Sequence, residues 1–73
     1  MNVIAIIGLG NFALNVLDQL ISTSTDLIIL DKDREIVEKY KKFVSNAYIA
    51  DAINSETLKK IIPENLTAAI VDL

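Results

Sequence analysis

Two glycines, Gly8 and Gly10, are the only ones in the chain, and they stand together near its beginning. An apolar run precedes them, Ala13 follows three positions later, and apolar residues then recur at helical spacing. This pattern is typical of the turn between a buried strand and a helix, where backbone N–H groups bind a dinucleotide's pyrophosphate. Gly8 permits the tight turn, Gly10 leaves room for phosphate, and Ala13 lets the helix pack closely. The sequence therefore predicts an anion site at a helix N-terminus.

An acidic residue, Asp31, ends the next apolar run, about 20 positions after the second glycine. In dinucleotide sites an acid at this spacing accepts hydrogen bonds from the ribose hydroxyls. Such a carboxylate also repels a 2′-phosphate, so it favours NAD or adenosine nucleotides over NADP. The alternative is a solvated carboxylate in a turn. Lys32 follows directly, and its ammonium group is either solvated or within reach of the adenine side.

Two further aspartates, Asp51 and Asp72, follow the later apolar runs. Asp51 is either a ligand contact or a cap for the helix that follows it. Asp72 is expected at the carboxyl end of the last strand, solvated and facing the same crevice. With Asp31 these carboxylates offer the oxygen ligands that Mg²⁺ or Ca²⁺ prefers, but their spacing matches no known loop, and we predict no metal site.

The apolar runs alternate with amphipathic stretches and predict the order β-α-β-α-β-α-β. Continuous apolar runs are typical of parallel strands covered on both faces. Right-handed crossovers then give an α/β, Rossmann-like half domain with strand order 3-2-1-4. Phe43 is expected to face the core from the second helix. The predicted strands span residues 2–7, 26–31, 46–50 and 66–73, and the predicted helices span 11–21, 33–44 and about 54–62.

The composition excludes several classes of function. The 73 residues contain no Cys and no His, which removes a thiolate nucleophile and the commonest general base. A net charge of −3 argues against nucleic acid as a partner. No apolar run approaches the length of a bilayer-spanning helix, and no secretory signal is evident. We therefore expect a cytoplasmic domain over residues 1–73 that has no catalytic residues and does not insert into a membrane.

Taken together, these segments resemble the RCK/KTN domain, a regulatory nucleotide-binding domain of potassium channels and transporters. Residues 3–13 look like that family's glycine turn, and residues 30–33 look like its acidic motif after the second strand. Residues 50–52, followed by residues 56–58, are similar to the segment in which that family's third strand ends. Residues 66–71 are similar to its fourth strand. The resemblance covers nearly the whole chain but about half of the family's full domain. Many members carry a basic residue where this chain has Asn11.

The resemblance implies a domain that binds an adenine nucleotide, NAD(H), AMP or ATP, and performs no chemistry. Ligand binding would bias a homodimer or larger oligomer that acts on a membrane pore subunit, which would place the domain at the membrane periphery. The alternative is the cofactor-binding fragment of an NAD-dependent dehydrogenase. A third interpretation is a purely structural fragment whose crevice binds no ligand. The residues that the resemblance assigns to the cofactor are Gly8, Leu9, Gly10, Asn11, Phe12, Ala13, Asp31, Lys32, Asp51 and Ala52.

The predicted strand order leaves the last strand at an edge of the sheet. A long, apolar edge strand associates readily with other strands unless something covers it. We therefore expect the chain either to be a fragment or to pair through this strand with another copy of itself.

Overall fold

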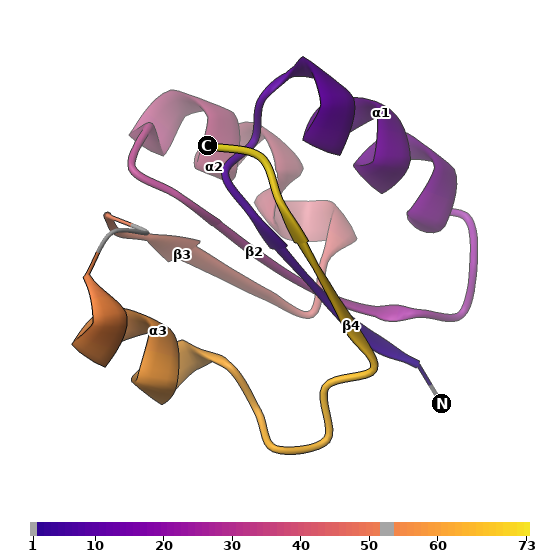
Figure 1. Ribbon diagram of the computed structural model, residues 1–73. Helices are drawn as coiled ribbons and strands as arrows, with labels where there is room; N and C mark the ends of the chain where they lie inside the picture. The colour runs from indigo at the N-terminus through magenta and orange to yellow at the C-terminus, as the bar shows by residue number, and fades with distance from the viewer. Residues whose placement is uncertain (1, 52–53) are drawn as a thin grey trace.

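The computed structural model describes residues 2–51 and 54–73, so Ala52, one of the predicted cofactor contacts, lies outside the described residues. Strands and helices alternate along the chain, as Figure 1 shows. In chain order the elements are β1 (Val3–Ile7), α1 (Asn11–Leu20), β2 (Asp26–Asp31), α2 (Arg34–Tyr40), η1 (Lys41–Phe43), β3 (Asn46–Ile49), α3 (Ser55–Ile61) and β4 (Ala68–Val71).

The four strands form one parallel sheet in the order β3-β2-β1-β4. The predicted fold class and strand order are therefore confirmed. In the register Ile6 of β1 lies beside Ile29 of β2 and Ile70 of β4. The chain first steps outward in one direction, from β1 to β3, and then crosses to the opposite side of β1 for β4. This reversal between β1 and β4 is the switch point at which α/β sheets of this kind bind ligands.

The reversal also decides which helix covers which face of the sheet. Two right-handed crossovers in one direction place α1 and α2 on the same face, and the third, in the opposite direction, places α3 on the other face (Figure 1). The larger core lies under α1 and α2, where Ile6 and Ile29 contact Leu17 and Val37. A smaller cluster lies under α3 and contains Val3, Ala5 and Ile28, with Ile61 packed against it.

Two elements differ from the sequence prediction by more than one residue at an end. β4 is shorter than predicted, because its pairing with Ile4–Ile7 of β1 covers only Ala68–Val71. The second helix is also shorter, since α2 ends at Tyr40 and continues as the 3₁₀ turn η1. The tighter winding of a 3₁₀ helix rotates its residues away from the α-helical face. Phe43 is therefore 48 % exposed, and its expected position in the core is wrong.

The helices differ in how their first N–H groups are satisfied. Asp33 caps α2 by accepting a hydrogen bond from the N–H of Glu35 at 3.0 Å. Asn54 caps α3 through the N–H groups of Glu56 and Thr57. Helix α1 begins after Gly10, which has no side chain to act as a cap, and its first turn contains no acidic residue. The N-terminus of α1 therefore needs a partner from elsewhere in the fold.

Candidate functional site at the switch point

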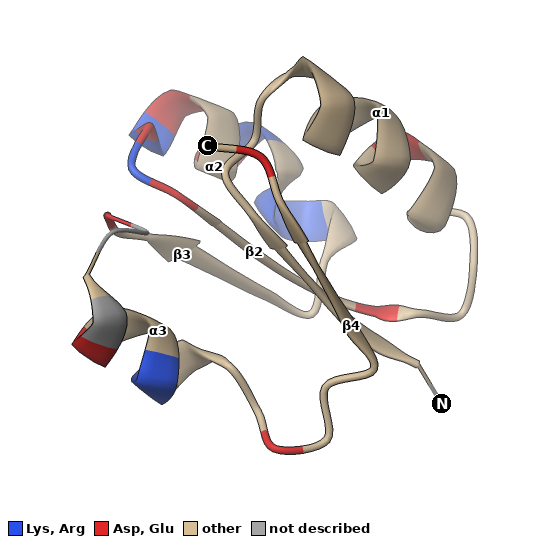
Figure 2. Ribbon diagram, in the orientation of Figure 1, with Lys and Arg blue, Asp and Glu red and all other residues tan. Residues whose placement is uncertain are grey.

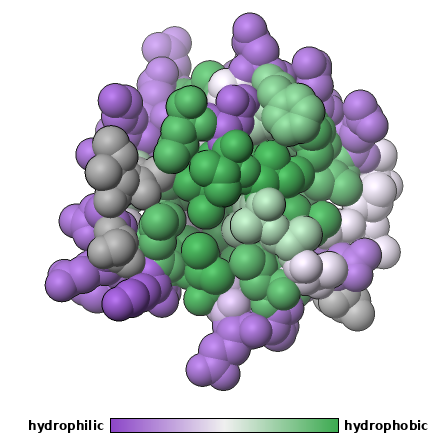
Figure 3. Space-filling view, viewed as in Figure 1, coloured by the Kyte–Doolittle hydropathy of each residue, from purple (hydrophilic) through white to green (hydrophobic). Residues whose placement is uncertain are grey.

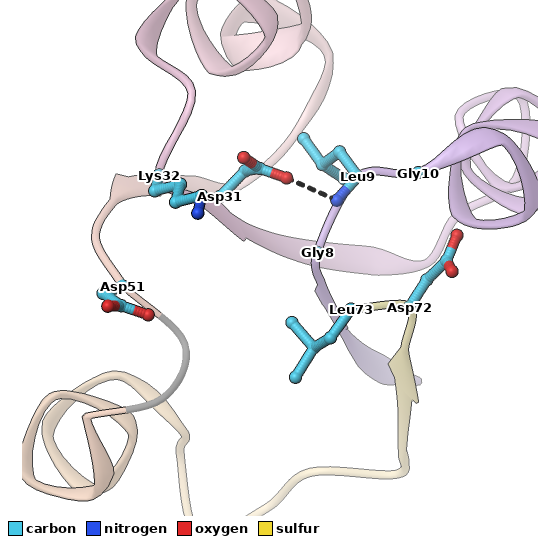
Figure 4. Close-up of a pocket in the computed structure, with 8 residues that line it drawn as sticks. All are labelled: Gly8, Leu9, Gly10, Asp31, Lys32, Asp51, Asp72 and Leu73. Atoms are coloured by element: carbon cyan, nitrogen blue, oxygen red, sulfur yellow. Dashed lines mark hydrogen bonds between the residues drawn. The ribbon is translucent and has the colours of Figure 1, made fainter.

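A cavity of about 430 Å³ opens at the carboxyl ends of β1, β2 and β4, where the N-terminus of α1 also lies (Figure 4). Its volume falls within the usual range for a small-molecule site. Strand ends and the loops that follow them supply its walls, as expected for a ligand site in an open parallel sheet. The cavity is lined by Gly8, Leu9, Gly10, Asp31, Lys32, Asp51, Asp72 and Leu73.

The glycine turn has the conformation that the sequence predicts for it. Gly8 has a φ of +84°, and it is the only described residue with a positive φ. A side chain at Gly8 would collide with the backbone carbonyl of Asp72. The N–H of Gly8 donates to the carbonyl of Leu30 at 2.9 Å, and the carbonyl of Ile7 accepts from the N–H of Asp72 at 2.8 Å. The turn is therefore held between the ends of β2 and β4.

Asp31 connects the end of β2 to the glycine turn. Its Oδ2 accepts a hydrogen bond from the N–H of Leu9 at 2.6 Å, which Figure 4 marks with a dashed line. Its Oδ1 accepts from the N–H of Asp33 at 2.8 Å. Each carboxylate oxygen has a second lone pair, so the group retains capacity to accept further hydrogen bonds. The predicted ribose acceptor is thus in the cavity, and backbone donors fix its position.

Asp72 supplies the missing partner for the N-terminus of α1. Its Oδ2 accepts a hydrogen bond from the N–H of Ala13 at 3.1 Å, across 59 positions of sequence. A carboxylate at this place also interacts favourably with the positive end of the helix dipole. Asp72 was expected to be merely solvated at the end of the last strand, and that expectation is wrong. Two signals in the sequence could have identified this contact. Gly10 has no side chain that could cap α1, and the predicted strand order places the end of β4 beside the end of β1.

The structure brings six of the ten predicted cofactor residues together around the cavity. They are Gly8, Leu9, Gly10, Asp31, Lys32 and Asp51. The side chain of Leu9 belongs to the core, so only its backbone is available to a ligand. Figure 4 shows Asp51 on the opposite side of the cavity from α1. The structure also brings Asp72 and Leu73 to the wall of the cavity. Asp72 was expected to face this crevice but not to be one of the ligand contacts, and Leu73 was not predicted.

Three predicted residues of the first turn of α1 do not line the cavity. Asn11 and Phe12 are both exposed, and the exposed fraction of Phe12 is 64 %. Ala13 is fully buried on the side of α1 that packs against the core, as expected for the small residue that lets this helix pack closely. Its N–H group, bonded to Asp72, is the part of this residue that faces the site. The proposed contacts of Asn11 and Phe12 with a ligand stay predictions.

Acidic groups dominate the charge around the cavity. Asp31, Asp51 and Asp72 contribute carboxylates, and Lys32 contributes the ammonium group among the lining residues. Figure 2 shows the basic residues mainly on α2, η1 and α3, and none on α1. Within the described residues, no group of three or more acidic side chains could hold a metal ion. Lys32 is thus the one basic residue among those that line the cavity in the described part of the chain.

The fold and the site together define a class of protein. A Rossmann-like half sheet, a glycine turn before α1 and an acid at the end of β2 form the arrangement that binds adenine dinucleotides. The family model for the TrkA-N domain matches residues 4–73, and the chain belongs to this family. The TrkA-N domain is the N-terminal, NAD-binding domain of the RCK/KTN group, so the resemblance seen in the sequence is confirmed. No curated protein matches the chain closely enough to be reported as a relative.

The helices of the described residues are short. None of them is long and apolar enough to cross a membrane.

Proposed function

We propose that the chain is the nucleotide-binding domain of a potassium channel or transporter system, which binds NAD(H) or another adenine nucleotide and regulates transport. Its family is associated with NAD binding and with the regulation of potassium transport. The observation that supports the proposal most directly is the cavity at the switch point, where the glycine turn and Asp31 share one wall. These are the two parts that recognise pyrophosphate and ribose in dinucleotide sites.

The proposed ligand lies along the carboxyl edge of the sheet. Its phosphates approach the turn from Gly8 to Ala13, and its ribose hydroxyls donate to Asp31. The adenine ring extends toward Asp51, across the cavity in Figure 4. Regulation then requires two conformations of an oligomer with different affinities for the nucleotide, because a ligand shifts an equilibrium only by that difference.

Binding rather than catalysis is proposed because the chain has no His and no Cys, and two of the three lining carboxylates already accept hydrogen bonds from the backbone. A dehydrogenase built on this half domain would need its acid or base from another segment.

Isothermal titration calorimetry with NAD, NADH, AMP, ATP and NADP tests the proposal. We expect heat of binding with NAD, NADH or an adenosine phosphate, and weaker binding of NADP, because Asp31 repels its 2′-phosphate. The absence of binding by every member of this panel would contradict the proposed function. A preference for NADP would contradict the role of Asp31 while leaving nucleotide binding intact.

We also propose that the chain associates with itself through the edge of the sheet formed by β4. Figure 3 shows apolar side chains gathered at the centre of the face that carries β4 in Figure 1. Val71 in this strand is 60 % exposed, and Leu73 just after it is 80 % exposed. Exposed apolar groups beside the unpaired donors and acceptors of an edge strand favour pairing with another strand.

The expected result is a dimer or larger species by light scattering at micromolar concentration. Val71→Lys should shift the population to the monomer, because charged side chains on edge strands oppose pairing. Phe43→Lys is the matched control, since Phe43 is also exposed but lies in η1, away from β4. A monomeric unmodified chain, or equal effects of the two substitutions, would exclude association through β4.

A further inference from the structure

The groups that should receive a phosphate already hold a carboxylate of the chain itself. The N–H of Ala13, in the first turn of α1, donates to Oδ2 of Asp72 at 3.1 Å. The first N–H groups of a helix have no partners within the helix and form an anion site together with the helix dipole. Asp72 therefore uses part of the charge and hydrogen-bonding capacity on which a bound phosphate would depend.

The same carboxylate fills the space above Gly10. A methyl group placed at Gly10 would lie 2.6 Å from Oδ2 of Asp72 and 3.0 Å from its Cγ. The absence of a side chain at the second glycine of this turn normally lets a pyrophosphate approach the backbone. In this chain the room left by Gly10 is occupied by Asp72, and Figure 4 shows the carboxylate beside the start of α1.

We infer that Asp72 is an internal competitor for the phosphate-binding part of the site, so that a nucleotide must displace its carboxylate before its phosphates reach the turn. The inference rests on the proposed function and adds a regulatory residue to it. The position of one carboxylate supports it in two ways, because the same Oδ2 accepts the hydrogen bond from Ala13 and lies over Gly10. The displaced carboxylate would also repel the phosphates at short range, because both are negatively charged.

The displacement requires rotation of one side chain rather than movement of a strand. The backbone N–H of Asp72 donates to the carbonyl of Ile7 at 2.8 Å, which holds the end of β4 against β1. The side chain of Asp72 is only partly buried, so it has space to turn toward solvent. The side chain of Asp72 thus has two positions. In the first its carboxylate caps α1, and in the second it points to solvent and leaves the first N–H groups of that helix available to the ligand.

The inference predicts a gain of affinity when the charge is removed. Asp72→Asn should bind NAD and AMP about tenfold more tightly than the unmodified chain, since it loses a like-charge contact and a charge-assisted hydrogen bond. Adenosine, which has no phosphate, should bind both proteins equally. Asp72→Ser removes the same charge and keeps an oxygen that can cap α1, so it should change the affinities in the same direction. Calorimetry in EDTA, without divalent cations, measures these affinities.

Asp18→Asn is the matched control. It removes one carboxylate from the exposed side of the same helix, outside the cavity, and should leave every affinity unchanged. A ¹⁵N-labelled sample gives a second readout, because the amide resonance of Ala13 should shift in Asp72→Asn and again when NAD binds. Circular dichroism establishes that each variant is folded.

The outcomes separate the two proposals. If the unmodified chain binds NAD and both Asp72 variants bind it no more tightly, Asp72 does not compete, and the proposed function stands. Equal gains for NAD and adenosine would also overturn the inference, because the effect would not involve phosphate. If neither the unmodified chain nor any variant binds a nucleotide, the proposed function fails and the inference fails with it.

Discussion

Gly8→Ala is expected to destabilise the domain by about 2–5 kcal/mol. A left-handed conformation costs an L-residue with a side chain about 1–2 kcal/mol, and forcing an extra methyl group into a packed place costs about 1–3 kcal/mol. Both penalties apply at Gly8, where φ is +84° and the new methyl group would collide with the backbone of Asp72. A domain of this length has roughly 4–11 kcal/mol of stability in total, so the loss is a large fraction of it. Urea unfolding followed by circular dichroism measures the change.

Gly10→Ala is the matched control for this experiment. Gly10 has a φ of −76°, which any residue adopts, and its nearest obstacle is the carboxylate of Asp72 rather than backbone. A carboxylate at the end of a side chain can rotate away, so we expect Gly10→Ala to cost less than about 1 kcal/mol. Equal losses of unfolding free energy for the two substitutions would show that the positive φ of Gly8 and its contact with the backbone of Asp72 do not determine the stability of the turn.

The two glycines also show how far the sequence predicts this site. The order of apolar runs predicted the sheet, and the spacing from Gly10 to Asp31 predicted that the acid would lie near the turn. Both are local or topological features: one depends on side-chain periodicity, the other on parallel strands ending at the same edge. The structure adds the contacts made by Asp31, whose two oxygens bind the N–H groups of Leu9 and Asp33.

Asp72 shows why the rest was not predicted. Its partner Ala13 is 59 positions away in sequence, and the contact depends on the direction of one side chain at the end of β4. Strand order alone places Asp72 beside the glycine turn but does not decide between solvent and the helix N-terminus. Similarly, the exposure of Phe43 follows from the change of α2 into a 3₁₀ turn, which the continuous apolar spacing of residues 36–44 did not indicate.

Asp31→Asn is expected to weaken NAD binding by about 1–3 kcal/mol, or about 5- to 150-fold, because hydrogen bonds from the ribose hydroxyls to a charged acceptor are lost. The same substitution removes the repulsion of a 2′-phosphate, so the affinity for NADP should stay constant or rise. The preference for NAD over NADP therefore falls. A loosened turn alone would weaken both ligands equally, since both carry the same pyrophosphate. Calorimetric titration of each ligand into each protein gives the four affinities required.

Asp33→Ala separates the role of Asp31 from the general loss of a carboxylate after β2. Asp33 lies two residues further on, is exposed, and caps α2 through the N–H of Glu35. Its removal should cost about 1 kcal/mol of stability, as is usual for an N-cap, and should leave the affinities for NAD and NADP unchanged. If Asp31→Asn weakens NAD and NADP by the same factor, Asp31 serves only to hold the turn through Leu9. If it weakens neither, the ribose lies elsewhere, and the acid that ends β2 has no part in recognising the sugar.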